Sequence, residues 1–191
     1  MKVMYYTNKD IADWDLIPSI IKSTGDEVML CVEKPTLQLI KSNEIDFIVS
    51  DRSRYLITQD IIDYLPRRII NLHPSFLPWN KGYYPNYWSI KNGTPHGVTL
   101  HYINAGIDGG DIIAQTRLSY TDDDTLRTTY DRCRKFMVEL FRLYWEDVRL
   151  CRVGSFIQEC DAGDIHYKKE FDCVFEKLPN GWDTKVRDIV K

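Results

Sequence analysis

The chain has 191 residues, a formal net charge of -3 and 43% hydrophobic residues. This length suits one domain, or one domain with a small appendage, and is enough to bury a sizeable core. The slight excess of acidic residues disfavours nucleic-acid binding, for which a basic surface is typical. The sequence shows neither a secretory leader nor an apolar run long enough to span a bilayer, so we expect a cytoplasmic protein without membrane contact.

Short strand-like and helix-like segments alternate through the first 72 residues. We expect strands at 1–6, 27–32, 45–50 and 68–72, and helices at 11–23, 35–42 and 58–65 between them. The continuous apolar run at 27–32 is typical of a strand covered on both faces. Alternation in such short units predicts an α/β fold with a parallel sheet and helices on both faces.

The pattern changes in the second half of the chain. After a helix at 85–91, with Pro85 in its first turn, two strands at 96–104 and 111–119 follow with only a glycine-rich loop between them. This spacing implies antiparallel pairing, so the sheet becomes mixed but stays mostly parallel. Apolar residues recur every three or four positions over 125–150, which predicts a long core-facing helix. We therefore expect a main domain at 1–152 and a small C-terminal appendage at 153–191.

Two loops hold the polar groups that a catalytic site needs. Asn71 and His73 stand at the end of the strand at 68–72, and Asp108 follows the strand at 96–104. Asn71 and His73 are two residues apart on extended backbone, so their side chains point the same way. Open α/β sheets place their chemistry at such strand ends. A non-ionisable N–H donor, a proton shuttle and a carboxylate suit the addition of a nucleophile to a carbonyl group.

The remaining histidines, His96, His101 and His166, are interpreted as structural. His101 has no second ligand at the spacing of a metal site, so no metal site is expected. No elbow-like motif specifies a serine or cysteine nucleophile either.

Three segments, in order and with their gaps, resemble a known family. They are Asn-x-His-Pro-Ser-x-Leu-Pro at 71–78, Gly-x-x-Pro-x-x-Trp at 82–88, and Gly-Val-Thr-x-His-x-x-x-x-x-x-Asp-x-Gly-Asp-Ile at 97–112. Together they resemble the formyltransferases that use 10-formyltetrahydrofolate. The resemblance implies a Rossmann-like formyltransferase fold, with the catalytic domain at 1–152.

The resemblance also implies a reaction. A neutral amine attacks the formyl carbon of the co-substrate 10-formyltetrahydrofolate, and tetrahydrofolate leaves. Asn71 would bond the oxyanion, His73 would take part in proton transfer, and Asp108 would set the state of His73 and hold a water. The folate would lie against Tyr55, Leu56, Ile57, Asn104, Gly106 and Ile107. Apolar side chains and backbone groups suit a flat pterin, although Tyr55, Leu56 and Ile57 equally suit ordinary packing at a helix entry.

Members of this family differ in the amine that they formylate. The turn Thr7-Asn8-Lys9-Asp10 lacks the glycines that admit a phosphate after a strand, which disfavours glycinamide ribonucleotide. The length and the net charge of the chain disfavour methionyl-tRNA as the acceptor. We expect the acceptor to be an amino deoxysugar linked to a nucleotide, taken to be dTDP. The formylated product would be used in lipopolysaccharide O-antigen biosynthesis. We expect the protein to be a homodimer. The residues expected to contact the sugar nucleotide are Ser75, Trp79, Lys81 and Tyr84.

Three alternatives stay open at this point. The chain could formylate another small amine such as glycinamide ribonucleotide, transfer the formyl group to water, or bind folate or a sugar without turnover. The joint presence of Asn71, His73 and Asp108 favours an enzyme, because binding alone does not need all three. A formamide product, as opposed to free formate, distinguishes transfer from hydrolysis.

Overall fold

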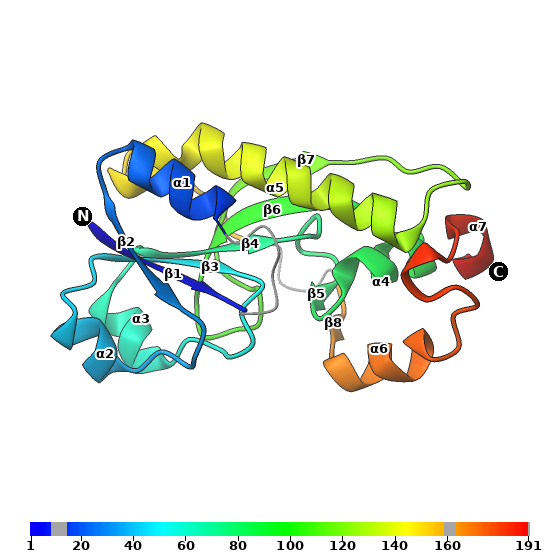
Figure 1. Cartoon of the computed structure of the whole chain (residues 1–191), viewed down its shortest axis with the longest axis horizontal. Helices are drawn as coiled ribbons and strands as arrows, with labels where there is room; N and C mark the ends of the chain where they lie inside the picture. Colours follow the sequence, from blue (N-terminus) through cyan, green and yellow to red (C-terminus); the bar gives the residue numbers. More distant parts are fainter. Residues whose placement is uncertain (9–14, 159–162, 191) are drawn as a thin grey trace.

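A six-stranded mixed sheet forms the centre of the protein (Figure 1). The computed structural model describes residues 1–8, 15–158 and 163–190. Within these residues the strand order is β2-β1-β3-β4-β6-β7. The strands are β1 (Lys2–Thr7), β2 (Glu27–Cys31), β3 (Phe47–Asp51), β4 (Ile69–His73), β6 (Gly97–Tyr102) and β7 (Ile112–Arg117). The pairs from β2 to β4 are parallel and the pairs β4–β6 and β6–β7 are antiparallel, which confirms the predicted mixed sheet.

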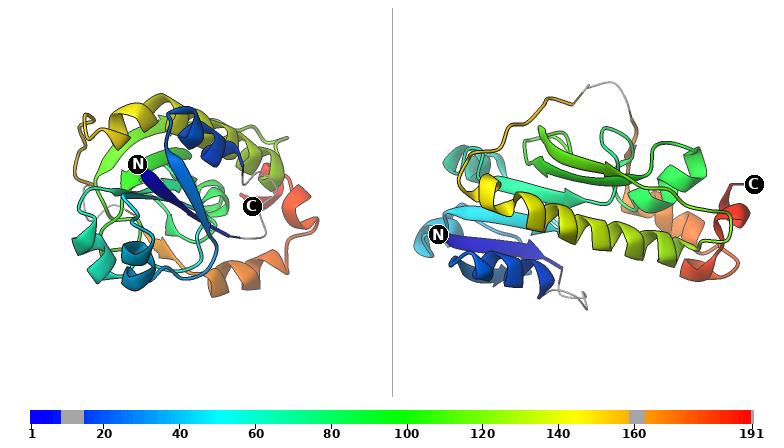
Figure 2. Two further views of the ribbon diagram at one scale, coloured as in Figure 1. Left: turned by 60° about the vertical axis from the view of Figure 1, so that its left-hand side comes forward. Right: turned by 90° about the horizontal axis from the view of Figure 1, so that it is seen from above.

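Helices cover both faces of this sheet, as predicted (Figures 1 and 2). Helices α1 (Leu16–Ser23) and α5 (Leu126–Arg149) pack on one face, and α2 (Leu37–Ser42) and α3 (Gln59–Tyr64) pack on the other. Helix α4 (Pro85–Asn92) contacts α5 and ends at Gly93, which has a φ of 62°. Among the described helices, none combines the length and apolar composition needed to cross a lipid bilayer.

Helix α5 contributes most of one core. Thr125 caps its N-terminus, since its hydroxyl accepts from the backbone N–H of Thr128 and its own N–H donates to the Thr128 hydroxyl. Phe141 is fully buried, and its ring centroid lies 5.1 Å from that of Trp145. Trp145 meets Phe47 of β3 edge to face at 5.3 Å. The predicted apolar stripe is confirmed, and Trp145 is part of it.

The C-terminal segment holds short elements that the sequence pattern did not predict. They are β8 (Ile165–His166), α6 (Lys168–Phe175), the 3-10 helix η1 (Gly181–Asp183) and α7 (Val186–Ile189). Strand β8 pairs in parallel with β5 (Lys81–Gly82), which was also not predicted. Phe171, Val186 and Ile189 pack with Tyr87 and Ile90 of α4 in a separate apolar cluster. Elements of two to eight residues are too short to show a clear period in the sequence.

Several element boundaries differ from the predicted ones. Strand β4 extends to His73, which therefore stands in the sheet ladder opposite Thr99. Strand β2 is an edge strand: Val28 and Met29 pack against the cores on opposite faces, whereas Leu30 is 47% exposed, so the expected coverage on both faces is only partial. The expected helix start at residue 11 and the turn residues Lys9 and Asp10 lie outside the described residues.

The packing of α5 generates a stability prediction. Phe141→Ala should lower the free energy of unfolding by about 3–5 kcal/mol, because it leaves a cavity against Trp145. Lys135→Ala on the same helix is the matched control. Lys135 is exposed, and its loss should change stability by less than about 0.5 kcal/mol. Urea denaturation followed by circular dichroism measures both, and equal losses would contradict the burial of this face.

Candidate active site

The antiparallel pairing of β4 with β6 brings the predicted catalytic residues together. Asn71 lies opposite His101 in this ladder. The loop after β6 then turns back so closely that a Cβ added at Gly110 would stand 1.9 Å from the carbonyl oxygen of Tyr102. Asp108 in this loop adopts a left-handed conformation, with a φ of 45°. Its carboxylate reaches the end of β4, so the structure unites Asn71, His73 and Asp108 as predicted.

Each oxygen of the Asp108 carboxylate has partners. Oδ1 accepts from Asn71 Nδ2 at 3.2 Å and lies 3.5 Å from His101 Nε2. Oδ2 accepts from the backbone N–H of Gly82 at 2.8 Å and lies 3.6 Å from His73 Nδ1. Burial opposes ionisation, but His73, His101 and the Gly82 N–H outweigh it and hold the pKa of Asp108 well below its usual range. Asp108 is therefore an ionised carboxylate at neutral pH.

The imidazole of His73 is enclosed, with 4% of the residue exposed. Nε2 lies 3.2 Å from the carbonyl oxygen of Asn80, which can only accept, so Nε2 carries the proton. Burial lowers the pKa of His73, and the Asp108 carboxylate opposes this shift. The ring is neutral at pH 7. Because both ring nitrogens face oxygen acceptors, it can take up a second proton when negative charge develops beside it.

His101 belongs to the same cluster, so its interpretation as a purely structural residue misses its place in the site. Its Nδ1 lies 2.7 Å from the carbonyl oxygen of Tyr102 and must donate to it. The lone pair on Nε2 therefore accepts from Asn71 Nδ2, at 3.2 Å. The amide group of Asn71 thus donates toward both His101 and Asp108. Pairing the two predicted strands in the right register would have revealed this position.

The residues expected to bind folate lie on two segments near this cluster. The hydroxyl of Tyr6 anchors the first segment, because it bonds both the N–H and the carbonyl oxygen of Tyr55 at 3.1 Å. Tyr55 and Leu56 are exposed, whereas Ile57 is buried. Asn104 and Gly106 of the second segment are exposed and Ile107 is half-buried. Ile57 of the first segment and Ile103, which precedes the second, pack in the same apolar cluster.

The four residues expected to contact the sugar nucleotide have different surroundings. Lys81 is half-buried and close enough to His73 to lower the pKa of that ring. Ser75 is buried and its hydroxyl donates to the carbonyl oxygen of Trp79, within the same loop. Tyr84 stacks on Phe171 of α6, with ring centroids 3.7 Å apart. Of these four residues, Lys81 alone has an interaction with Asn71, His73 or Asp108 in the part of the chain that the structure describes.

In the part of the chain that the structure describes, no group of three or more His, Cys, Asp or Glu side chains is placed to hold a metal ion. The chemistry available to the cluster is that of an amide donor, two imidazoles and a carboxylate. Such groups stabilise an oxyanion and move protons without a metal.

Comparison with known proteins decides the family. The sequence model of the formyl transferase family matches residues 29–143. The chain belongs to this family. The matched region runs from β2 into α5 and contains Asn71, His73 and Asp108. The resemblance found in the three sequence segments is thus confirmed, and so is the formyltransferase fold.

Two curated formyltransferases illustrate the range of relatives. The dTDP-4-amino-4,6-dideoxyglucose formyltransferase of Mycobacterium tuberculosis is 31% identical over 129 residues, which are 66% of this chain and 53% of that protein. The methionyl-tRNA formyltransferase of Listeria monocytogenes is 30% identical over 134 residues, or 65% of this chain and 43% of that protein. The chain spans about half the length of the curated relatives it matches.

One solved formyltransferase is similar over almost the whole chain. It is PseJ from Anoxybacillus kamchatkensis, whose crystal structure contains UDP-4,6-dideoxy-4-formamido-L-AltNAc and tetrahydrofolate. The two structures superpose with a TM-score of 0.91 at 38% identity, covering 99% of this chain and 97% of PseJ. The similarity therefore includes the C-terminal elements that follow residue 143.

The neutral, buried state of His73 predicts a pH dependence of stability. Because the pKa of His73 is below 6.5 in the folded chain, the unfolded chain takes up the proton first. The stability that this group contributes is therefore present above pH 6.5 and is lost as the pH falls below it. The free energy of unfolding, from urea denaturation, should fall between pH 7 and pH 5, and fall less in His73→Gln. An identical fall in both proteins would contradict a neutral, buried His73.

Proposed function

We propose that the protein is an N-formyltransferase, which moves the formyl group of 10-formyltetrahydrofolate to the amino group of a nucleotide-linked amino deoxysugar. The observation that carries this proposal is a cluster in which Asp108 contacts both Asn71 and His73, within a chain of the formyl transferase family. Tetrahydrofolate in the PseJ structure supports the choice of co-substrate.

The relatives of the chain support the choice of a nucleotide-linked amino sugar as the acceptor. PseJ contains a UDP-linked formamido sugar, and the mycobacterial relative is a formyltransferase of a dTDP-linked amino sugar. Since PseJ is similar over nearly its whole length, we propose UDP-linked 4-amino sugars as the first acceptors to test. The dTDP carrier expected from the sequence is the second.

The proposed reaction is an acyl transfer between two nitrogens. The lone pair of the neutral sugar amine attacks the formyl carbon, a carbon–nitrogen bond forms, and the carbonyl oxygen becomes an oxyanion. The bond between the formyl carbon and N10 of the folate then breaks. One proton leaves the attacking amine and one reaches N10, so the products are a formamide and tetrahydrofolate. No oxidant or reductant is needed.

We propose one task for each of the three residues, and the geometry supports each of them. Asn71 Nδ2 donates at 3.2 Å to both Asp108 and His101, and these long bonds can be exchanged for a bond to the oxyanion. His73 can receive a proton because both of its nitrogens face acceptors. Asp108 is ionised, so it favours the protonated state of His73 and can hold a water that carries a proton to N10.

The contacts with the two substrates complete the proposal. We propose that the folate binds between Tyr55–Ile57 and Asn104–Ile107, whose exposed backbone and apolar side chains suit a pterin. Lys81 is proposed to face the sugar nucleotide, because it lies at the catalytic cluster and carries positive charge. For Ser75, Trp79 and Tyr84, direct contact with the sugar nucleotide stays a prediction.

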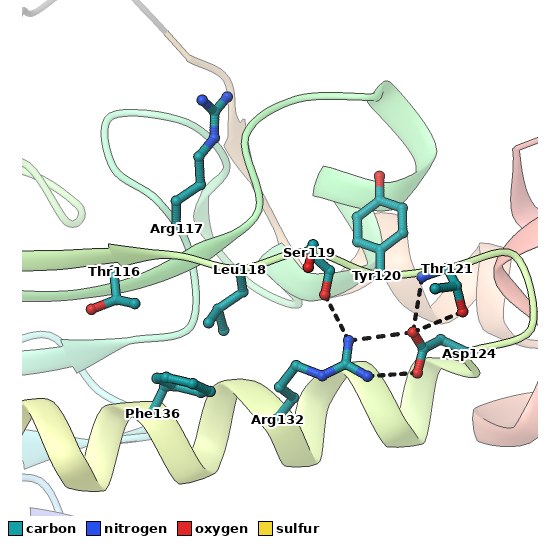
Figure 3. A pocket seen from close by; sticks show the side chains of 9 residues that line it. All are labelled: Thr116, Arg117, Leu118, Ser119, Tyr120, Thr121, Asp124, Arg132 and Phe136. Carbon is teal, nitrogen blue, oxygen red and sulfur yellow. Dashed lines mark hydrogen bonds and ion pairs between the residues drawn. The ribbon is translucent and has the colours of Figure 1, made fainter.

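The assembly and setting are part of the same proposal. We propose a catalytic domain at 1–152 with an appendage at 153–191, a homodimer, and action in the cytoplasm on a precursor of lipopolysaccharide O-antigen. A surface groove of about 340 Å³ supports the dimer (Figure 3). It runs between edge strand β7 and α5, and Phe136 lines it. Phe136 and Leu143 are exposed apolar residues of this face, which is typical of a surface for association.

Formylation is tested directly by mass spectrometry. The protein is incubated with 10-formyltetrahydrofolate and a panel of UDP- and dTDP-linked 3-amino and 4-amino deoxysugars, with glycinamide ribonucleotide included. We expect one formyl group on one sugar nucleotide, no product with His73→Ala, and a rate lowered about a hundredfold in Asn71→Ala, which lacks an oxyanion donor. Free formate alone would support a hydrolase instead, and folate binding without product would support a binding protein.

If the protein is a dimer, a charge placed in the proposed contact should lower its mass in solution. Light scattering after gel filtration should give twice the chain mass for the native protein and a lower mass for Leu143→Glu, because a charge would enter the apolar contact. Tyr64→Glu, an exposed aromatic on α3, is the control and should stay dimeric. A native protein that elutes as a monomer would refute the dimer.

A further inference from the structure

We propose that Gln158 is a positioning residue, which orients the Asp108 carboxylate by clamping the backbone of the loop that carries it. Gln158 lies in the C-terminal segment, beyond the region matched by the family model. Its side-chain Nε2 donates to the carbonyl oxygen of Asp108 at 2.8 Å and to that of Gly110 at 2.7 Å. Its effect on catalysis rests on the proposed function, but its effect on the geometry does not.

The backbone delivers Gln158 to this place through a short bridge. Phe156 pairs with Ile112 at the start of β7, and the two residues exchange N–H to carbonyl hydrogen bonds of 2.8 and 3.0 Å. Gln158 follows two residues later and is 5% exposed. The backbone of this segment is therefore bonded to the sheet at Phe156, and the side-chain amide of Gln158 is bonded to the loop.

The loop that carries Asp108 needs hydrogen bonds from elsewhere, because its own residues do not fix its backbone conformation. The backbone of Asp108 is in the left-handed conformation. This conformation is unfavourable for a residue with a Cβ and persists only where the surrounding structure imposes it. Gly109 and Gly110 follow, and glycine restricts the backbone least of all residues. By bonding the carbonyls of Asp108 and Gly110, the Gln158 amide fixes the direction of two peptide planes around this flexible pair.

The side-chain oxygen of Gln158 supports this assignment. Oε1 is buried and has no hydrogen-bond partner in the part of the chain that the structure describes. A buried acceptor without a partner is unfavourable. The favourable contribution of this side chain must therefore come from the two bonds that Nε2 donates to the loop.

The C-terminal segment also supports Asp108 from the other side. Strand β8 pairs with β5, and a Cβ at Gly82 would stand 2.3 Å from the carbonyl oxygen of His166. This contact holds Gly82, whose N–H bonds Asp108 Oδ2. Gln158 thus fixes the backbone of Asp108, and the β5–β8 pair presents a donor to its carboxylate.

Two substitutions and one control test the role of Gln158. Gln158→Leu removes the amide, and Gln158→Glu keeps the shape but cannot donate. We expect each to lower kcat about tenfold to a hundredfold, with KM for the amino sugar changed less than about threefold, because a catalytic group is misplaced. Ser155→Ala removes another contact of the same segment, with Arg67 and Asp111, and should leave kcat unchanged.

A titration without substrates makes the test independent of the proposed function. His73 faces Asp108, His101 and Lys81, and only Asp108 brings negative charge. If the carboxylate turns away in Gln158→Leu, the pKa of His73, followed by NMR, should fall by about one unit. It should not change in Ser155→Ala. An unchanged or raised pKa in folded Gln158→Leu and Gln158→Glu, or an equal loss of kcat in Ser155→Ala, would overturn the proposal.

Discussion

The ionised carboxylate of Asp108 is the interaction on which the site depends. A charge held away from water is unfavourable unless donors face it, and here two donors come from separate strands. Asn71 on β4 and Gly82 on β5 donate N–H groups to it, and His101 on β6 accepts from Asn71 beside it. Bringing these groups together requires β4 and β6 to be antiparallel neighbours. The change of direction in the sheet is therefore a requirement of the site.

Much of the fold could be predicted from periodicity and spacing. The parallel units before residue 72 and the antiparallel pair after residue 96 follow from the lengths of the connections, and the apolar stripe of α5 follows from its period. The position of each strand in the order of the sheet does not follow from such patterns. Strand β2 has an apolar run, yet it lies at the edge, because strand order is set by packing far along the chain.

The candidate residues Asn71, His73 and Asp108 were predictable from a strand end and from the loop after a neighbouring strand, whereas the residues that support them were not. His101 belongs to the motif Gly-Val-Thr-x-His at 97–101, but its place in the site follows from its register with Asn71. Gln158 lies in a segment without periodic pattern, fifty residues after Asp108, and only the bridge from Phe156 to Ile112 brings it back. Contacts of this kind depend on the direction of single side chains, which spacing in the sequence does not specify.

The antiparallel return of β6 beside β4 has a consequence for how such a protein diversifies. The segment between His73 and Gly97 leaves the sheet and re-enters it next to its point of departure, so its two ends are anchored in neighbouring strands. This segment includes α4 and the loop before it. The ladder between the strands fixes Asn71 and His101, and the short stretch at 80–82 holds His73 and the Asp108 carboxylate. The rest of the segment can therefore change in length and composition without displacing these side chains.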